Sequence, residues 1–284
     1  MGWLLDYDGP AVRYQALTAI LERQPDVPAV REARAGLAAD PVITEVLARQ
    51  VHDQGWGTPA DPTTATGPAT GDHLVLLAEL GVPGRDERVA TAADWALDQA
   101  RQPNGDTVLP GAFLWALLKF GYVEDARVRR AVHLAAKSLV ARGTPDAPVQ
   151  RTPWEGLPAL WALLQLPASE RNRGIEAAVQ TALADWDHLD WTTLEPSRVQ
   201  FGFPHLGAPD LLFALRVLAE AGRLTDARYR PALDRLLTQQ SERGRWPLVH
   251  NHADRLLVVA EAAGAESKWS TLNALRVLKA TEPT

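Results

Sequence analysis

The sequence predicts an all-α protein of one domain, built from helical hairpins in two layers. Apolar residues recur at helical spacing along most of the chain, and no segment shows a convincing strand pattern. Nearly all-apolar segments alternate with more polar, amphipathic ones, which is typical of buried inner helices paired with half-exposed outer helices. A Gln-x-x-x-Gly-x-Trp turn between helices also recurs in degraded form. An open solenoid of hairpins remains an alternative, because alternation by itself does not close a ring.

The N-terminal part of the chain, residues 1–56, predicts three helices, over 10–23, 27–38 and 42–51. The next segment, 57–71, is rich in Pro, Thr and Gly and predicts a flexible loop.

The remaining part, residues 72–284, predicts the hairpin repeats. Apolar inner helices start near His73, Ala112, Leu157, Asp210 and Ser270. Outer helices follow the first four of them, over 87–101, 125–142, 169–184 and 226–240. Glycine stands directly after three of the inner helices, where a left-handed residue ends a helix: Gly81, Gly121 and Gly222. No linker divides the chain, so one domain over 1–284 is expected.

Composition excludes several classes of function. The chain of 284 residues has no cysteine, so disulfides, thiolate metal sites and a cysteine nucleophile are absent. Its net charge of −6 argues against a nucleic-acid partner. No stretch approaches the roughly 18 apolar residues of a membrane span, and Met1–Asp8 lacks the basic start of a signal peptide. We therefore expect a cytoplasmic protein.

The repeated turns carry a family resemblance. Gln240–Trp246 (QSERGRW) resembles the glutamine–tryptophan repeats of squalene/hopene cyclases and protein prenyltransferases. Gln50–Trp56 (QVHDQGW) keeps both ends with its glycine one place late, and Gln102–Gly105 is a copy without the tryptophan. Both ends of the chain, Trp3–Tyr14 and Ser267–Leu278, look like those of small bacterial proteins with prenyltransferase/squalene-cyclase repeats.

The resemblance implies an (α/α) toroid, a barrel of helical hairpins around a central apolar cavity. It does not extend to the catalytic motifs. The Asp-x-Asp-Asp acid of class II cyclases is missing, and its nearest match, Asp185–His188 (DWDH), follows an outer helix and is read as a solvated pair. The zinc-binding cysteine of prenyltransferases is missing too, and Leu109–Ala112 stands where small relatives often carry cysteines. These absences imply that the metal site of the family has been lost or that the protein has a divergent role.

Candidate catalytic residues lie at the starts of the inner helices, which share one rim if the helices enter a ring in the same direction. Carboxyl groups facing an apolar cavity would have a raised pKa and would serve as general acids. We rank Asp210 first, then Glu155, then Asp72, with His205 orienting the acid. The alternative is that each carboxylate simply caps its helix.

Candidate substrate-binding residues are aromatic or lie on the same rim: Trp115, Trp161, Phe113, Phe203, Trp154 and His73. Aromatic faces can stabilise developing cations, although aromatic residues at helical spacing also serve as plain core. His250, His252 and Asp254 alternate in a loop and offer ligand types that suit zinc, but no fourth ligand is near. We therefore expect no metal and no cofactor.

Taken together, these features favour a cyclase- or isomerase-like enzyme that acts by acid–base catalysis on an apolar, isoprenoid or polyketide-like small molecule. The alternative is a non-catalytic binding protein or scaffold of helical repeats. An open cavity of about 300–1,000 Å³ would favour the enzyme. A centre filled by Trp115 and Trp161 would favour the scaffold.

Overall fold

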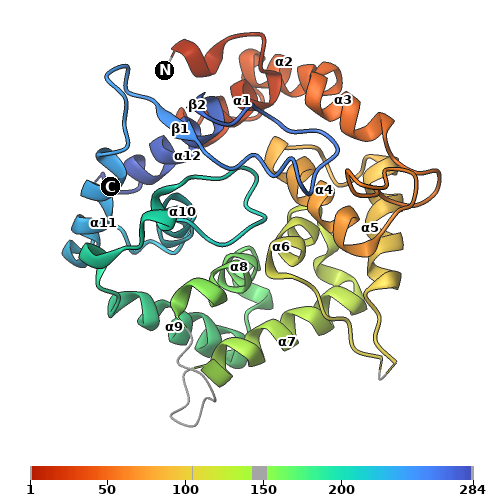
Figure 1. Ribbon diagram of the computed structural model, residues 1–284. Helices are drawn as coiled ribbons and strands as arrows, with labels where there is room; N and C mark the ends of the chain where they lie inside the picture. Colours follow the sequence, from red (N-terminus) through yellow and green to blue (C-terminus); the bar gives the residue numbers. More distant parts are fainter. Residues whose placement is uncertain (1, 104, 143–151, 283–284) are drawn as a thin grey trace.

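The computed structural model describes residues 2–103, 105–142 and 152–282, and most of them are helical, as predicted (Figure 1). The N-terminal helices are α1 Pro10–Gln15, which continues as a π-helix over Ala16–Ile20, α2 Pro28–Gly36 and α3 Pro41–Ala48. The inner helices are α4 Gly67–Leu80, α6 Gly111–Lys119, α8 Pro153–Leu164, α10 Leu211–Glu220 and α12 Lys268–Lys279. The outer helices are α5 Glu87–Gln99, α7 Ala126–Arg142, α9 Arg173–Asp187 and α11 Arg230–Leu237.

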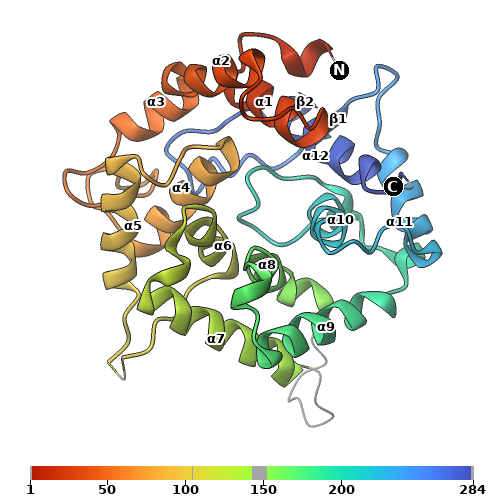
Figure 2. The ribbon, with the colours of Figure 1, turned by 180° about the vertical axis from the view of Figure 1, so that it is seen from behind.

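The inner helices follow one another around a common centre. Each of α4, α6, α8, α10 and α12 contacts the next, and α1 contacts both α12 and α4, so the circuit of contacts is complete. Figures 1 and 2 show α5, α7, α9 and α11 outside this circuit. Inner helices such as α10 are buried on nearly every side, which explains why their sequences are almost wholly apolar. No helix in the described part of the chain combines the length and apolarity that crossing a membrane requires.

Two local predictions were wrong. The loop predicted over 57–71 ends earlier, because α4 begins at Gly67, where Thr66 caps it by accepting a hydrogen bond from the Ala69 N–H and Pro68 lies in the first turn. A small antiparallel sheet was not predicted. It pairs β1 Trp246–Leu248 with β2 Ala265–Ser267, and strands this short carry no alternation that a pattern could reveal.

The repeated turn has the same geometry in its two complete copies. The indole N–H groups of Trp56 and Trp246 each donate to the backbone carbonyl ten residues earlier, at 2.7 and 2.9 Å. The backbone N–H groups of the same tryptophans donate to Thr70 and Thr271 of the following inner helices, at 3.0 and 3.1 Å. Each tryptophan thus ties one helix to the next inner helix, and both are fully buried.

The incomplete copy, Gln102–Gly105, keeps the backbone turn but has no tryptophan to join two helices. The N–H of Gly105 donates to Gln102, as that of Gly244 donates to Ser241, and both glycines have positive φ, +81° and +73°. Buried Thr107 lies two residues after Gly105, as Trp246 lies two residues after Gly244, so it takes the place of the tryptophan. The backbone turn is therefore present even where its tryptophan is absent.

We expect Trp246→Phe to lower the free energy of unfolding by about 2 kcal/mol, because the indole hydrogen bond to the Leu236 carbonyl is lost and the smaller ring leaves space. Urea unfolding followed by circular dichroism measures the change. Trp95→Phe is the matched control, since Trp95 is only partly buried and should cost less than about 1 kcal/mol. Equal losses for the two variants would contradict the structural role of the repeated turn.

Candidate active site

Two long segments, 188–210 and 249–264, reach over the centre at the end where the inner helices begin (Figure 1). They are joined to each other, because the Phe203 N–H donates to the His250 carbonyl at 3.0 Å. They are also held to α4. The Arg255 guanidinium binds both carboxylate oxygens of Asp72, at 2.6 and 2.9 Å, and the Leu257 N–H donates to His73 Nε2 at 3.0 Å.

A pocket of about 530 Å³ lies between these segments and the start of α10, and we name it the His252 pocket. Its lining includes Asp210, His205, His252, Arg198, Phe213 and Leu206. The volume falls within the range of small-molecule sites. The pocket is at one mouth of the helical circuit rather than at its centre.

Asp210 is both a helix cap and a wall of this pocket. One carboxylate oxygen accepts from the Phe213 N–H and the other from the Gly202 N–H, each at 2.8 Å. Burial raises the pKa of Asp210 to about 7, although the backbone hydrogen bonds and the charge of Arg198 act to lower it. The capping and catalytic interpretations of this residue are therefore compatible.

His252 faces the same pocket from the other segment. Its φ of +56° is unfavourable for a residue with a side chain, and strain of this kind tends to gather at functional sites. Gly202 and Gly207 make room for the ring, since a Cβ on Gly207 would lie 3.0 Å from its Cε1 and one on Gly202 would lie 3.3 Å from its Nε2. Burial lowers the pKa of His252 to about 4, so the imidazole is neutral at pH 7.

His205 is the third group of the pocket whose pKa is displaced. It is buried, stacks on Phe213 with ring centroids 4.3 Å apart, and its Nε2 lies 3.9 Å from a carboxylate oxygen of Glu79. Burial holds the pKa of His205 well below its ordinary value, and the nearby charge of Arg216 acts in the same direction. Within the described residues, His205 Nε2 has no hydrogen-bond partner.

The other predicted acids lie elsewhere. Asp72 lines a separate apolar pocket of about 240 Å³, which we name the Phe113 pocket and which also includes Val75, Leu109 and Leu206. Glu155 is exposed in the first turn of α8 and is absent from the lining of both pockets. Of the three predicted carboxylates, the structure therefore places only Asp210 in the His252 pocket, together with His205.

His73 and Asp187 have structural partners. His73 Nδ1 donates to the Ala69 carbonyl at 2.7 Å while Nε2 accepts from Leu257, and the ring stacks on Trp56. Both of its nitrogens are thus used inside the protein. Asp187 belongs to Asp185–His188, the nearest match to the cyclase motif, and lies at the end of outer helix α9. Its carboxylate accepts a hydrogen bond from the Tyr229 hydroxyl at 2.6 Å.

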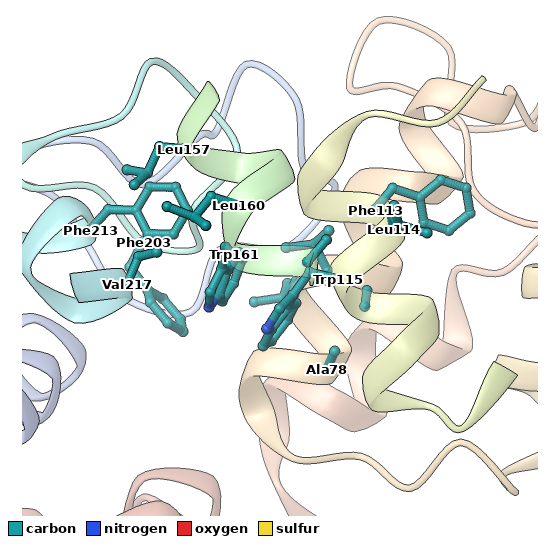
Figure 3. Packing of buried hydrophobic residues seen from close by; sticks show 14 of the residues in the cluster. Ala78, Phe113, Leu114, Trp115, Leu157, Leu160, Trp161, Phe203, Phe213 and Val217 are labelled. Atoms are coloured by element: carbon teal, nitrogen blue, oxygen red, sulfur yellow. The ribbon is translucent and has the colours of Figure 1, made fainter. Parts of the chain in front are cut away.

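Most of the predicted aromatic wall is packed core. Trp115 and Trp161 stack on each other with ring centroids 3.8 Å apart, and Figure 3 shows both indole nitrogens at the same end of the stack. Phe203 stacks on Trp269, and Trp154 packs edge-on against Trp186 and Trp191. Phe113 and Trp115 do line pockets, but the stacked pair fills part of the centre that was expected to be open.

No group of three or more His, Cys, Asp or Glu side chains that could hold a metal ion exists within the described residues. His250, His252 and Asp254 therefore do not converge, and the candidate metal site was wrong. His250 is exposed and pairs with Gln200, with its Nε2 3.3 Å from the amide oxygen, and the backbone of His252 is left-handed.

A buried ion pair between Glu79 and Arg216 was not predicted from the sequence. One terminal nitrogen of Arg216 lies 2.8 Å from both carboxylate oxygens of Glu79, and both residues are buried. A signal for it was available, since each is a charged residue flanked by apolar residues in an inner helix. Short sequences also recur between inner helices, as a separate signal: ALRVL at 214–218 and 274–278, and WALL at 115–118 and 161–164.

Compared with models of known protein families, the chain matches none, and a search of curated proteins finds no match either.

Proposed function

We propose that the chain is an (α/α) toroid of the terpene cyclase/prenyltransferase type and that the His252 pocket performs acid–base chemistry on a small molecule. The complete circuit of inner helices supports the first part. The second part rests on one observation, that three titratable groups with displaced pKa values, Asp210, His205 and His252, line a single pocket. Such clusters are characteristic of active sites.

The proposed reaction is a proton shift. The neutral His252 imidazole takes a proton from one substrate atom, the bonding electron pair moves along the substrate, and the protonated Asp210 carboxyl donates a proton to another atom. The substrate is isomerised or cyclised without net gain of protons. The imidazolium and carboxylate that remain are reset by proton exchange with water. His205, neutral and wedged against Phe213, shapes the wall beside them.

The neighbouring Phe113 pocket supports a partly apolar substrate. Leu206 lines both pockets, so it stands between a polar compartment and an apolar one. A molecule with a polar reacting end and an isoprenoid or polyketide-like tail would place the end beside Asp210 and the tail beside Phe113. Burial of the tail would contribute about 0.8 kcal/mol per methylene group to binding.

A non-catalytic binding protein or scaffold is the second candidate. Two observations favour it: Trp115 and Trp161 fill space at the centre, and Asp72 is neutralised by Arg255. In this case the His252 pocket would hold a ligand without changing it.

Comparative turnover in D₂O tests the proposal. Wild-type protein and the variants Asp210→Asn and His252→Gln are incubated with a small-molecule extract of cells that encode the protein, and products are followed by mass spectrometry. We expect the wild type to isomerise or deuterate a compound and each variant to do so at least about 100-fold more slowly. Activity should fall below about pH 4, where His252 is protonated, and above about pH 7, where Asp210 is ionised.

Asp86→Asn is the matched control, because Asp86 caps outer helix α5 through the same kind of backbone hydrogen bond, away from the pocket. Melting temperatures of the variants that match that of the wild type would show that unfolding is not the cause of lost activity. A wild type that changes no compound, or equal turnover by wild type and Asp210→Asn, would refute the catalytic role. A ligand that stays unchanged while it is bound would establish the second candidate.

A further inference from the structure

A second large cavity lies at the opposite mouth, where the inner helices end. Its volume is about 550 Å³, and it is lined from α4, α6, α10 and α12 and from the N-terminal helices; we name it the Arg276 pocket. The space exists because small residues line it: Ala19, Ala78, Ala219 and Ala280. Trp115 forms part of its wall, so the stacked tryptophans lie between this pocket and the rest of the centre.

The charged groups of this pocket are unevenly paired. Four cationic residues line it, Lys119, Arg216, Arg276 and Lys279, together with four carboxylates, Glu22, Glu79, Glu220 and Glu282. Arg216 pairs with both Glu79, at 2.8 Å, and Glu220, which lies 3.5 Å from its Nε. Lys279 and Glu22 form their own ion pair, 2.9 Å apart. Glu282, the remaining acid of the lining, is exposed.

Arg276 and Lys119 are the cations of the lining that have no ion-pair partner among the described residues. The acceptors of Arg276 in this part of the chain are neutral, the side-chain oxygens of Gln15 at 2.6 Å and Asn273 at 3.0 Å. Across the described ranges, neither Arg276 nor Lys119 forms an ion pair with a carboxylate. Burial lowers the pKa of Arg276 to about 10, which still leaves it charged at neutral pH.

Unpartnered donors surround the same space. Within the described residues, three buried nitrogens of the lining have no hydrogen-bond partner: Trp115 Nε1, Arg216 Nε and Arg276 Nε. All three are N–H donors, so the missing partner is an acceptor. Helix C-termini attract cations and account for the presence of Arg216 and Arg276 near this mouth, but they leave these donors unsatisfied.

We infer that the Arg276 pocket binds a small organic oxyanion, with its carboxylate or phosphate group on Arg276 and Lys119 and its apolar body against Trp115 and the four alanines. The anion pairs with the two cations that have no carboxylate partner, and small adjustments of the side chains bring its oxygens to the free N–H groups. This site is separate from the His252 pocket and does not depend on the function proposed there.

Isothermal titration calorimetry with three probes tests the inference: octanoate, octyl phosphate and the uncharged analogue octanamide. We expect either anion to bind at least about tenfold more tightly than octanamide, which corresponds to one charge-assisted hydrogen bond. The tighter of the two anions identifies the head group. Raised salt should weaken the binding of both anions.

Lys119→Met and Arg276→Met should each weaken anion binding about tenfold or more without affecting octanamide. Lys119 is exposed, so its variant should fold normally even if Arg276→Met does not. Arg228→Met, an exposed arginine of the outer layer, is the matched control and should leave binding unchanged. The indole N–H resonance of Trp115, assigned through Trp115→Phe, should shift on addition of anion.

Equal affinities for octanoate and octanamide, or anion binding that survives Lys119→Met and Arg276→Met unchanged, would overturn the inference. Absence of binding by both anions at millimolar concentration would do the same. Asp210→Asn should bind octanoate like the wild type. Failure of the anion site is therefore distinguishable from failure of the proposed acid–base chemistry.

Discussion

We expect Arg216→Met to destabilise the protein by about 3–5 kcal/mol, because removing one partner of a buried ion pair leaves the other charge buried and uncompensated. Glu79, whose side chain is 1% exposed, would retain no strong partner. Arg216 also lies over the Trp161 ring, 5.1 Å from its centroid, so a cation–π contact is lost as well. Urea unfolding at pH 7 measures the change.

A double-mutant cycle separates the ion pair from packing. Glu79→Met combined with Arg216→Met should recover much of the loss, since replacing both partners by apolar groups removes the stranded charge. Arg230→Met is the control for an exposed pair, with Asp234, and should cost less than about 1 kcal/mol. A loss below about 1 kcal/mol for Arg216→Met would show that the pair is not buried as described.

The second large effect is acid destabilisation through His73. Burial lowers the pKa of His73 from its ordinary 6.5 to about 4. The unfolded chain therefore takes up this proton at a higher pH than the folded protein does, and stability falls as the pH drops from about 6.5 to about 4. The loss from this residue should reach about 2 kcal/mol by pH 5. Protonation would also place an N–H against the Leu257 N–H, which loosens segment 249–264.

His73→Phe isolates this effect, since phenylalanine can still stack on Trp56 but does not titrate. Between pH 7 and pH 5, we expect the free energy of unfolding of the variant to fall by about 2 kcal/mol less than that of the wild type, as measured by urea unfolding. Both proteins contain His205, His252 and Asp210, so the contributions of these residues to the pH dependence of stability cancel in the comparison. As the pH falls, the two histidines lower the stability and Asp210 raises it. Exposed His133→Phe is the control, and an unaltered pH dependence in His73→Phe would contradict the prediction.

Local features of the sequence were enough for the helices and turns. The periodicity of apolar residues reports on which face of a helix is buried, and that depends only on near neighbours in the chain. Gly81, Gly121 and Gly222 have φ of +90°, +93° and +68°, as their predicted role at helix ends requires. The start of α4 was missed because Pro and Gly in 57–71 were taken as loop signals, although Pro68 after Thr66 is also a helix start.

The candidate site could be predicted only in part. Asp210 and His205 were predicted as site residues, and they share the His252 pocket, because both belong to the segment that leads into one inner helix. His252 was considered only as a metal ligand, since its partners in the pocket lie more than forty residues away in the chain. Asp72 was predicted as an acid, yet Arg255, 183 residues later, neutralises it.

The sequence by itself determined that this chain is helical, layered and without thiol chemistry, because these properties follow from composition and from interactions between residues a few positions apart. Only the tertiary structure decided which charges meet, as in Glu79 with Arg216 across 137 positions, and which aromatic rings fill the centre. The physical reason is that burial and partnership of a polar group are set when distant helices pack. The same carboxylate can be a cap, an ion-pair partner or an acid, according to what that packing places beside it.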